Sequence, residues 1–207
     1  MGIQRARQRG RKAFRRQPGN KPGRRVLIVC EGSATEPGYF EALKRKLKLG
    51  GMVIRGDEVG TAPINVVDDA LAEKRRAQRA GEPFDSVWCV FDRDEHTSFA
   101  QAIDKARANG LKIAISIPCF EFWLLLHYEY TTRPFTDYND IRRNNLSAHC
   151  PDYHKSKVNW DDVLTRLETA KVHAKRVRAS QESGEQYPNP STTVDLLVEH
   201  LESLVST

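Results

Sequence analysis

Two short apolar runs, each followed at once by acidic residues, place the strongest constraint on how this chain folds. One run covers residues 26–30 and precedes Glu31; the other covers 87–91 and precedes Asp92 and Asp94. Runs this short, rich in β-branched and aromatic residues, are typical of strands buried in a parallel sheet. Ligands of such sheets bind beyond the carboxyl ends of the strands. The three carboxylates are therefore expected to share one crevice.

Three acids in one crevice repel each other unless a cation neutralises them. Carboxylate oxygens suit hard cations, so Mg²⁺, or Mn²⁺ in its place, is the expected cofactor. For each acid alone, a helix cap remains the alternative interpretation. Gly32 favours the site, because a glycine lets the backbone turn sharply and admits a phosphate closely. The pattern predicts a metal site directed at phosphate chemistry.

Strand-like and helical patterns alternate through the first part of the chain. This alternation predicts an α/β fold with a parallel four-stranded sheet flanked by helices and joined by right-handed crossovers. The expected strands are 26–30, 52–59, 85–91 and 111–117, and the expected helices are 35–49, 64–81 and 99–109.

Beyond Pro118 the pattern becomes helical. A buried helix is expected over 120–128, a long helix from Trp160 and a last helix from Ser191, with no clear period over 129–160. Three parts follow: a basic, disordered tail (1–24), an α/β core (25–128) and a helical elaboration packed on the core (129–207).

The positive charge of the chain lies in its N-terminal tail. Of 33 basic residues, ten lie in 1–25 with no acid, which leaves 23 basic and 27 acidic residues in 26–207, a net charge of −4. The tail is interpreted as a phosphate-binding arm or as a solubilising extension. No segment is apolar enough for a membrane span or a signal peptide, so a cytoplasmic protein is expected.

Four motifs resemble those of the RloB-like family. They are residues 31–40 (EGSATEPGYF), 91–96 (FDRDEH), 117–127 (IPCFEFWLLLH) and 189–194 (NPSTTV), and together they extend the resemblance from about residue 25 to the C-terminus. The family is linked with bacterial phage defence and abortive infection, often beside restriction-modification genes. Its core is similar to the TOPRIM fold of topoisomerases, primases and overcoming-lysogenisation-defect nucleases.

The resemblance implies a metal-dependent nuclease. In the TOPRIM fold a Glu after the first strand and a DxD after the third bind Mg²⁺, and Glu31, Asp92 and Asp94 match them. Many TOPRIM proteins carry a further acid where this chain has His96, so Glu95, Glu36 or Glu121 would have to supply that oxygen. The resemblance also suggests RNA, including tRNA, in preference to DNA as substrate, and an ATPase or a restriction-modification component as partner.

Other residues are candidates by their place in the sequence. Glu121 follows the fourth strand and is a candidate general base, whereas His127 in the same apolar helix is expected to be structural. Lys155 is a candidate for contact with the scissile phosphate. Glu36 is either a helix-terminus acid or a site residue. The candidates for substrate binding are Tyr138, Arg142, Arg143, Tyr153, Ser191 and Thr192, of which the last two would open a helix and cradle a phosphate.

Two other classes of function stay open. The carboxylates could bind a metal–nucleotide signal or scaffold a complex without catalysis. A phosphotransferase or phosphatase is the third reading, but one of haloacid-dehalogenase type would need its DxD after the first strand, where this chain has Glu31.

Overall fold

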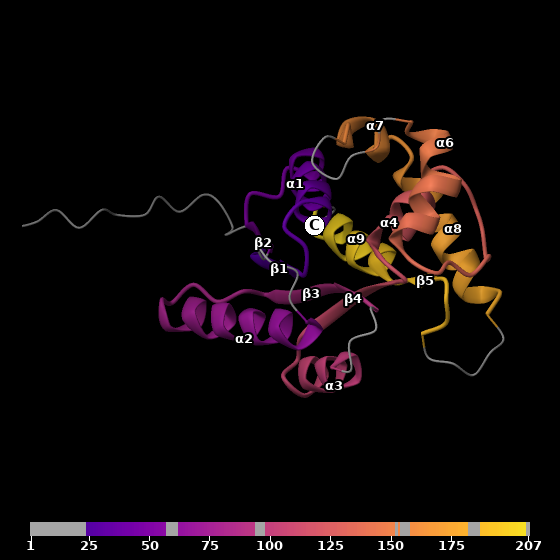
Figure 1. Cartoon of the computed structure of the whole chain (residues 1–207). Helices are drawn as coiled ribbons and strands as arrows, with labels where there is room; N and C mark the ends of the chain where they lie inside the picture. The colour runs from indigo at the N-terminus through magenta and orange to yellow at the C-terminus, as the bar shows by residue number, and fades with distance from the viewer. Residues whose placement is uncertain are drawn as a thin grey trace, which may run out of the picture.

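One five-stranded sheet organises the chain (Figure 1). The computed structural model describes residues 24–56, 62–93, 98–151, 153, 158–181 and 187–205. The order in the sheet is β2-β1-β3-β4-β5, with β5 antiparallel to β4 and the other pairs parallel. The strands are β1 (Val26–Cys30), β2 (Met52–Gly56), β3 (Ser86–Asp92), β4 (Lys112–Ile117) and β5 (Ser191–Thr192).

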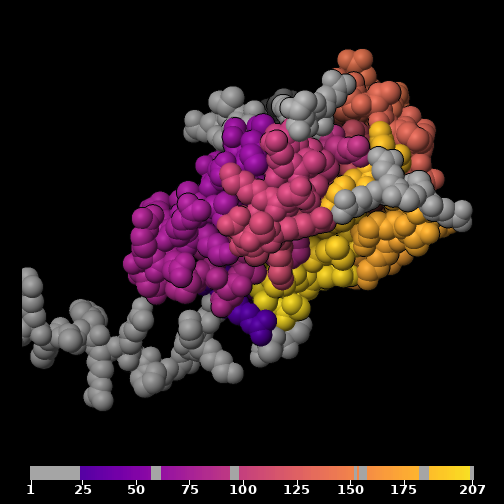
Figure 2. Space-filling view, turned by 90° about the horizontal axis from the view of Figure 1, so that it is seen from below, coloured from indigo at the N-terminus to yellow at the C-terminus, as the bar shows by residue number. Residues whose placement is uncertain are grey.

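Helices cover both faces of this sheet. In Figure 1, α2 and α3 lie on one side of it, while α1, α4, α8 and α9 lie on the other; Figure 2 is a view from below, onto the α2–α3 face. The helices are α1 (Thr35–Leu47), α2 (Pro63–Arg79), α3 (Phe99–Ala108), α4 (Phe120–Leu125), α5 (Tyr138–Ile141), the π-helical turn η1 (Arg142–Leu146), α6 (Ser147–His149), α7 (Trp160–Leu164), α8 (Leu167–Ala179) and α9 (Val194–Ser203).

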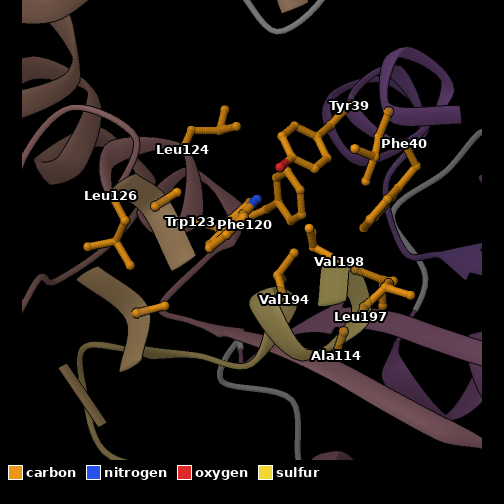
Figure 3. Close-up of a cluster of buried hydrophobic side chains, with 14 of the residues drawn as sticks. Tyr39, Phe40, Ala114, Phe120, Trp123, Leu124, Leu126, Val194, Leu197 and Val198 are labelled. Carbon is orange, nitrogen blue, oxygen red and sulfur yellow. The ribbon is translucent and has the colours of Figure 1, made fainter. Parts of the chain in front are cut away.

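The central strands are apolar on both faces because each face has its own core. Successive side chains of a strand point to opposite faces, so Val26, Ile28 and Cys30 join one core while Leu27 and Val29 join the other. The larger core is aromatic at its centre. Figure 3 shows Tyr39 and Phe40 from α1 beside Phe120 and Trp123 from α4, with Val194, Leu197 and Val198 of α9 beneath them.

The order of the strands defines where a ligand crevice lies. From β1 the chain passes through α1 to β2, and then through α2 back across β1 to β3. The connection that follows β1 runs through α1 to β2, and the connection that follows β3 runs through α3 to β4 in the opposite direction along the sheet. Because α1 and α3 also cover opposite faces, the carboxyl ends of β1 and β3 form a topological switch point. Glu31 and Asp92 stand at these two strand ends.

The predicted α/β fold, with a parallel sheet, flanking helices and a C-terminal helical region, is confirmed, with two differences. First, Ser191 and Thr192 form a short fifth strand on β4, and the last helix begins at Val194. Second, the helix from Trp160 is interrupted at Thr165 and Arg166. The Thr165 hydroxyl donates to the carbonyl of Asp162, 2.6 Å away, and so competes with the backbone ladder.

An ion pair between the partly exposed Arg178 and the buried Asp195 ties the C-terminal helices to β5. Arg178 of α8 donates from both terminal nitrogens to the two carboxylate oxygens of Asp195, each at 2.6 Å, and also to the Thr192 carbonyl at 2.7 Å. Asp195 is fully buried at the first turn of α9. The pair therefore fixes α8, β5 and α9 relative to one another.

No helix in the described part of the chain is both long and apolar enough to cross a membrane. The four cysteines are free thiols, and Cys30, Cys89 and Cys119, which lie in or beside strands, are buried.

Candidate functional site at the carboxyl edge of the sheet

Glu31 and Asp92 are hydrogen-bonded to each other across β1 and β3. The backbone N–H of Asp92 donates to Oε2 of Glu31 over 3.0 Å, and the backbone N–H of Glu31 donates to the carbonyl of Val90, also over 3.0 Å. Glu31 is buried and Asp92 half-buried. The two strands are parallel neighbours, which puts Glu31 and Asp92 at one edge of the sheet. That Asp94 shares a crevice with them stays a prediction, because Asp94 lies outside the described residues.

Glu36 belongs to the same edge because its carboxylate lies over Gly32. A Cβ atom at Gly32 would come within 2.6 Å of Oε2 and 2.9 Å of Oε1 of Glu36. Glu36 is buried in the first turn of α1, where a negative charge also favours the helix terminus. Gly32 thus leaves room for the carboxylate, which any larger residue would displace.

The environments of two buried thiols show how these acids converge. Burial, followed by the negative charge of Glu36, raises the pKa of Cys30 well above its usual value, with Asp92 adding to the effect. Burial, followed by the charges of Glu121 and Asp92, does the same for the pKa of Cys119. Glu36 and Asp92 therefore both lie near Cys30, and Glu121 and Asp92 both lie near Cys119.

Glu121 is almost fully buried at the start of α4 and accepts a hydrogen bond from Tyr153. The Tyr153 hydroxyl lies 3.1 Å from Oε1 of Glu121. Burial, and then the charge of Glu121, raise the pKa of Tyr153, and Tyr138 lies close enough to contribute. Of the two tyrosines predicted to bind substrate, Tyr153 thus contacts Glu121 and Tyr138 lies near Tyr153.

Ser191 and Thr192 support the edge instead of opening a helix. The Thr192 hydroxyl lies 3.0 Å from that of Ser116 and donates to the carbonyl of Ile115 over 3.2 Å. Ser116 is the register partner of Asp92 in β4. The prediction that the last helix begins at Ser191 is wrong, because Ser191 and Thr192 are buried in β5 and α9 begins at Val194. The Thr192 hydroxyl nevertheless accepts the N–H of Val194 over 3.2 Å at the start of that helix. Phosphate binding by these two residues stays a prediction.

His127 is structural, as expected. It is buried, with Nδ1 3.0 Å from the carbonyl of Trp123 and Nε2 3.3 Å from the hydroxyl of Tyr39. Nδ1 donates to the carbonyl, so Nε2 accepts from the tyrosine. Burial lowers the pKa of His127 to about 4, so the ring is neutral at pH 7.

Several predicted site residues cannot be placed at this edge. Asp94, Glu95, His96 and Lys155 lie outside the described residues, as do residues 1–23 of the tail. Arg142 is half-buried and Arg143 exposed on η1, which packs against α4. A role in substrate binding for these two arginines stays a prediction.

The donor set at the edge is made of oxygen atoms from carboxylates. Glu31, Glu36, Asp92 and Glu121 are ligands that Mg²⁺ and Mn²⁺ prefer over softer metals. Within the described ranges, no three His, Cys, Asp or Glu residues are grouped closely enough to hold a metal ion. The described carboxylates fit part of such a site, and Asp94 would have to complete it.

The fold and this edge define a mainly parallel α/β protein with carboxylates at its topological switch point. The chain belongs to the RloB-like family, whose model, described as RloB-like protein, matches residues 26–201. A search of curated proteins found no match. The matched residues include every strand and almost all of α9.

Proposed function

We propose that this protein is a metal-dependent nuclease that hydrolyses phosphodiester bonds, preferring RNA, including tRNA, over DNA, in bacterial anti-phage defence by abortive infection. The observation that carries this proposal is the hydrogen-bonded pair Glu31 and Asp92 at the switch point of the sheet. Membership of the RloB-like family supports it, through the likeness of that family to TOPRIM nucleases. An ATPase or a restriction-modification component is the proposed partner.

Glu31, Asp92 and Asp94 are the residues that would hold Mg²⁺ or Mn²⁺, which when bound polarises the phosphodiester and stabilises the charge on the leaving oxygen. The chain itself orients these ligands. The N–H of Asp92 holds the Glu31 carboxylate in place, and the space over Gly32 is taken by the carboxylate of Glu36 rather than by a phosphate.

Glu121 is the proposed general base. Its burial in the first turn of α4 and its hydrogen bond from the Tyr153 hydroxyl fix the direction of its carboxylate. A positioned carboxylate can take a proton from the attacking water. Lys155 is proposed to neutralise the scissile phosphate from the same segment of the chain as Tyr153.

The preference for RNA rests on aromatic and basic residues in the C-terminal region. Tyr153 contacts Glu121 and lies near Tyr138, and Arg142 and Arg143 follow α5 directly. Aromatic side chains stack on unpaired bases, and arginines clamp the backbone. The choice of tRNA is an analogy with abortive-infection toxins that attack translation.

A second candidate is a non-catalytic module that binds a metal–nucleotide signal or scaffolds a defence complex. The same hydrogen-bonded pair, Glu31 and Asp92, would serve this function, because a metal–nucleotide ligand needs the same carboxylate oxygens. In that case Glu31 and Asp92 would contribute to ligand binding only.

End-labelled RNA and DNA of the same sequence, incubated with the protein and Mg²⁺ or Mn²⁺, distinguish the two candidates. The nuclease proposal predicts cleavage products with RNA that disappear with EDTA and in Asp92→Asn. Glu199→Gln is the matched control, because Glu199 precedes His200, which hydrogen-bonds Ser86 at the opposite end of β3 over 2.9 Å. Metal-dependent nucleotide binding without cleavage would favour the binding module.

A further inference from the structure

A hollow lies on the α2–α3 face, at Arg93, the residue that follows Asp92 in the chain. It has a volume of about 240 Å³ and is formed by the first part of α3, the residue after β3 and the segment before β5. We call it the arginine–tyrosine pocket. Its principal side chains are Arg93, Phe99, Asp104, Arg107 and Tyr187.

Two guanidinium groups are fixed in this pocket by one tyrosine. Arg107 donates to the hydroxyl of Tyr187 over 3.0 Å, and Arg93 donates to its backbone carbonyl. The guanidinium of Arg93 also lies 5.8 Å from the centre of the Phe99 ring. Asp104 is the single acid among the lining residues, so the pocket is positive and its cations are held in place before any ligand arrives.

The aromatic rings of the pocket form a wall. Phe99 and Tyr187 meet edge to face, with ring centres 5.6 Å apart and planes at 89°. Both are half-buried, whereas Arg93 and Arg107 are exposed. The hollow therefore offers ring surface inside and positive charge at its rim.

The pocket adjoins the acidic edge through the main chain. Arg93 follows Asp92 directly, and its N–H donates to the carbonyl of Ser116 in β4 over 3.1 Å. The backbone at Arg93 is therefore still paired with β4, one residue beyond the end of β3. Successive side chains of an extended chain point to opposite faces. Asp92 thus faces the core that contains Cys119, and Arg93 faces the α2–α3 side. A strand of nucleic acid lying across this edge would reach both.

We infer that the arginine–tyrosine pocket binds one unpaired nucleotide next to the scissile phosphodiester. The inference rests on the proposed nuclease function and adds a requirement for single-stranded substrate. The volume is below the ~300 Å³ of sites for drug-sized ligands, which suits one base. Aromatic rings stack on any base, and arginine adds cation–π and phosphate contacts. A base stacked within a duplex cannot enter.

The test is the binding of labelled single-stranded RNA and of the matching duplex, measured by fluorescence anisotropy in EDTA across a salt series. Tyr187→Ala should weaken single-strand binding by about 5- to 150-fold, the effect of losing one stacked base. Arg107→Gln should reduce the salt slope by about 0.7. Duplex binding should not change with Tyr187→Ala.

Two further variants control this experiment. Tyr187→Phe keeps the ring and loses only the hydroxyl that holds Arg107, so it should restore most of the affinity lost in Tyr187→Ala. Arg79→Gln removes an exposed charge at the end of α2, shortly before β3 begins, and should leave single-strand binding unchanged. Melting temperatures of all variants verify that they fold.

The outcomes separate this inference from the proposed catalysis. If Tyr187→Ala and Arg107→Gln bind single strands as the wild type does, the pocket is not a nucleotide site, whether or not the protein cleaves RNA. If single-strand and duplex affinity fall equally, the pocket is an electrostatic contact only and base binding is refuted. If the variants lose single-strand binding while the wild type cleaves nothing, the pocket is a nucleotide-binding site and the proposed nuclease function is refuted.

Discussion

The backbone N–H of Asp92 donates a hydrogen bond to the carboxylate of Glu31, 3.0 Å away. This bond joins β1 and β3, the neighbouring strands at the topological switch point of the sheet. This contact joins two acids that are 61 residues apart in the sequence. Because the donor is a backbone group, replacing the Asp92 side chain leaves the bond in place. Charge at this edge can therefore be changed without changing the geometry of the sheet.

Asp92→Asn and Glu31→Gln should each reduce metal-dependent cleavage by about 100-fold or more, the loss typical of one preorganised electrostatic group. Because the two acids act as one unit, the double variant should cost much less than the sum of the single variants. Single-turnover cleavage rates measure this, with Glu199→Gln as the control. Strictly additive losses would show that the two acids act independently.

Gly32→Ala should displace the carboxylate of Glu36 while the fold survives, because the added Cβ meets only the end of that side chain, at 2.6 Å. We expect weaker divalent-ion binding with a small change in melting temperature. Gly50→Ala is the matched control, since a Cβ there meets nothing within 4 Å. Unchanged ion binding in Gly32→Ala would place Glu36 outside the functional site.

Asp195→Asn should lower the free energy of unfolding by about 1.5–3 kcal/mol, because it removes the charge that accepts two hydrogen bonds from the partly exposed Arg178. Glu199→Gln breaks the exposed pair with Lys175 between the same two helices and should cost about 1 kcal/mol or less. Urea denaturation compares them. Equal losses of unfolding free energy in the two variants would show that the pair with the buried Asp195 stabilises the protein no more than the exposed pair does.

His127 should make stability fall in mildly acidic solution. Its pKa is about 4 in the folded protein and 6.5 ordinarily, so as pH falls from 6.5 towards 4 the unfolded chain binds a proton that the folded protein does not. The free energy of unfolding should drop by about 3 kcal/mol over that range and be unaffected by His127 above it.

Denaturation of wild type and His127→Gln at several pH values isolates this term, since the other histidines titrate in both proteins. In His127→Gln, the free energy of unfolding should no longer show the part of its decrease between pH 6.5 and 4 that His127 causes. The same pH dependence in both proteins would contradict the assignment of a neutral, buried His127.

The basic tail should increase affinity for nucleic acid without adding to stability. Deleting residues 1–23 should flatten the salt dependence of binding, with a slope change near 0.7 for each phosphate of a single strand that the tail neutralises. Filter binding across a salt series measures it, with melting temperature as the control. An unchanged slope would leave the tail a solubilising role.

The edge that carries Glu31 and Asp92 was predictable because it depends on local sequence. A run of buried strand residues ends at the sheet edge, and the acid that follows it must stand there. Parallel pairing of the two strands follows from the helices between them. The burial of His127 was predictable for the same reason, from the apolar residues around it.

Two features were not predictable because they depend on tertiary contacts. A strand of two residues, Ser191 and Thr192, has no periodicity, and only its pairing with Ser116 and Ile117 reveals it. The arginine–tyrosine pocket joins Arg93 to Tyr187 across 94 residues. The one sequence signal for the pocket was Arg93, which lies between the two acids of the second motif.

Mn²⁺ binding, followed by electron paramagnetic resonance, tests the central claim most directly. We predict that the wild type and Glu199→Gln bind the ion alike, and that Asp92→Asn and Glu31→Gln lose most of this binding while keeping the melting temperature of the wild type. Equal binding by all four proteins would contradict a metal site at the carboxyl edge of β1 and β3.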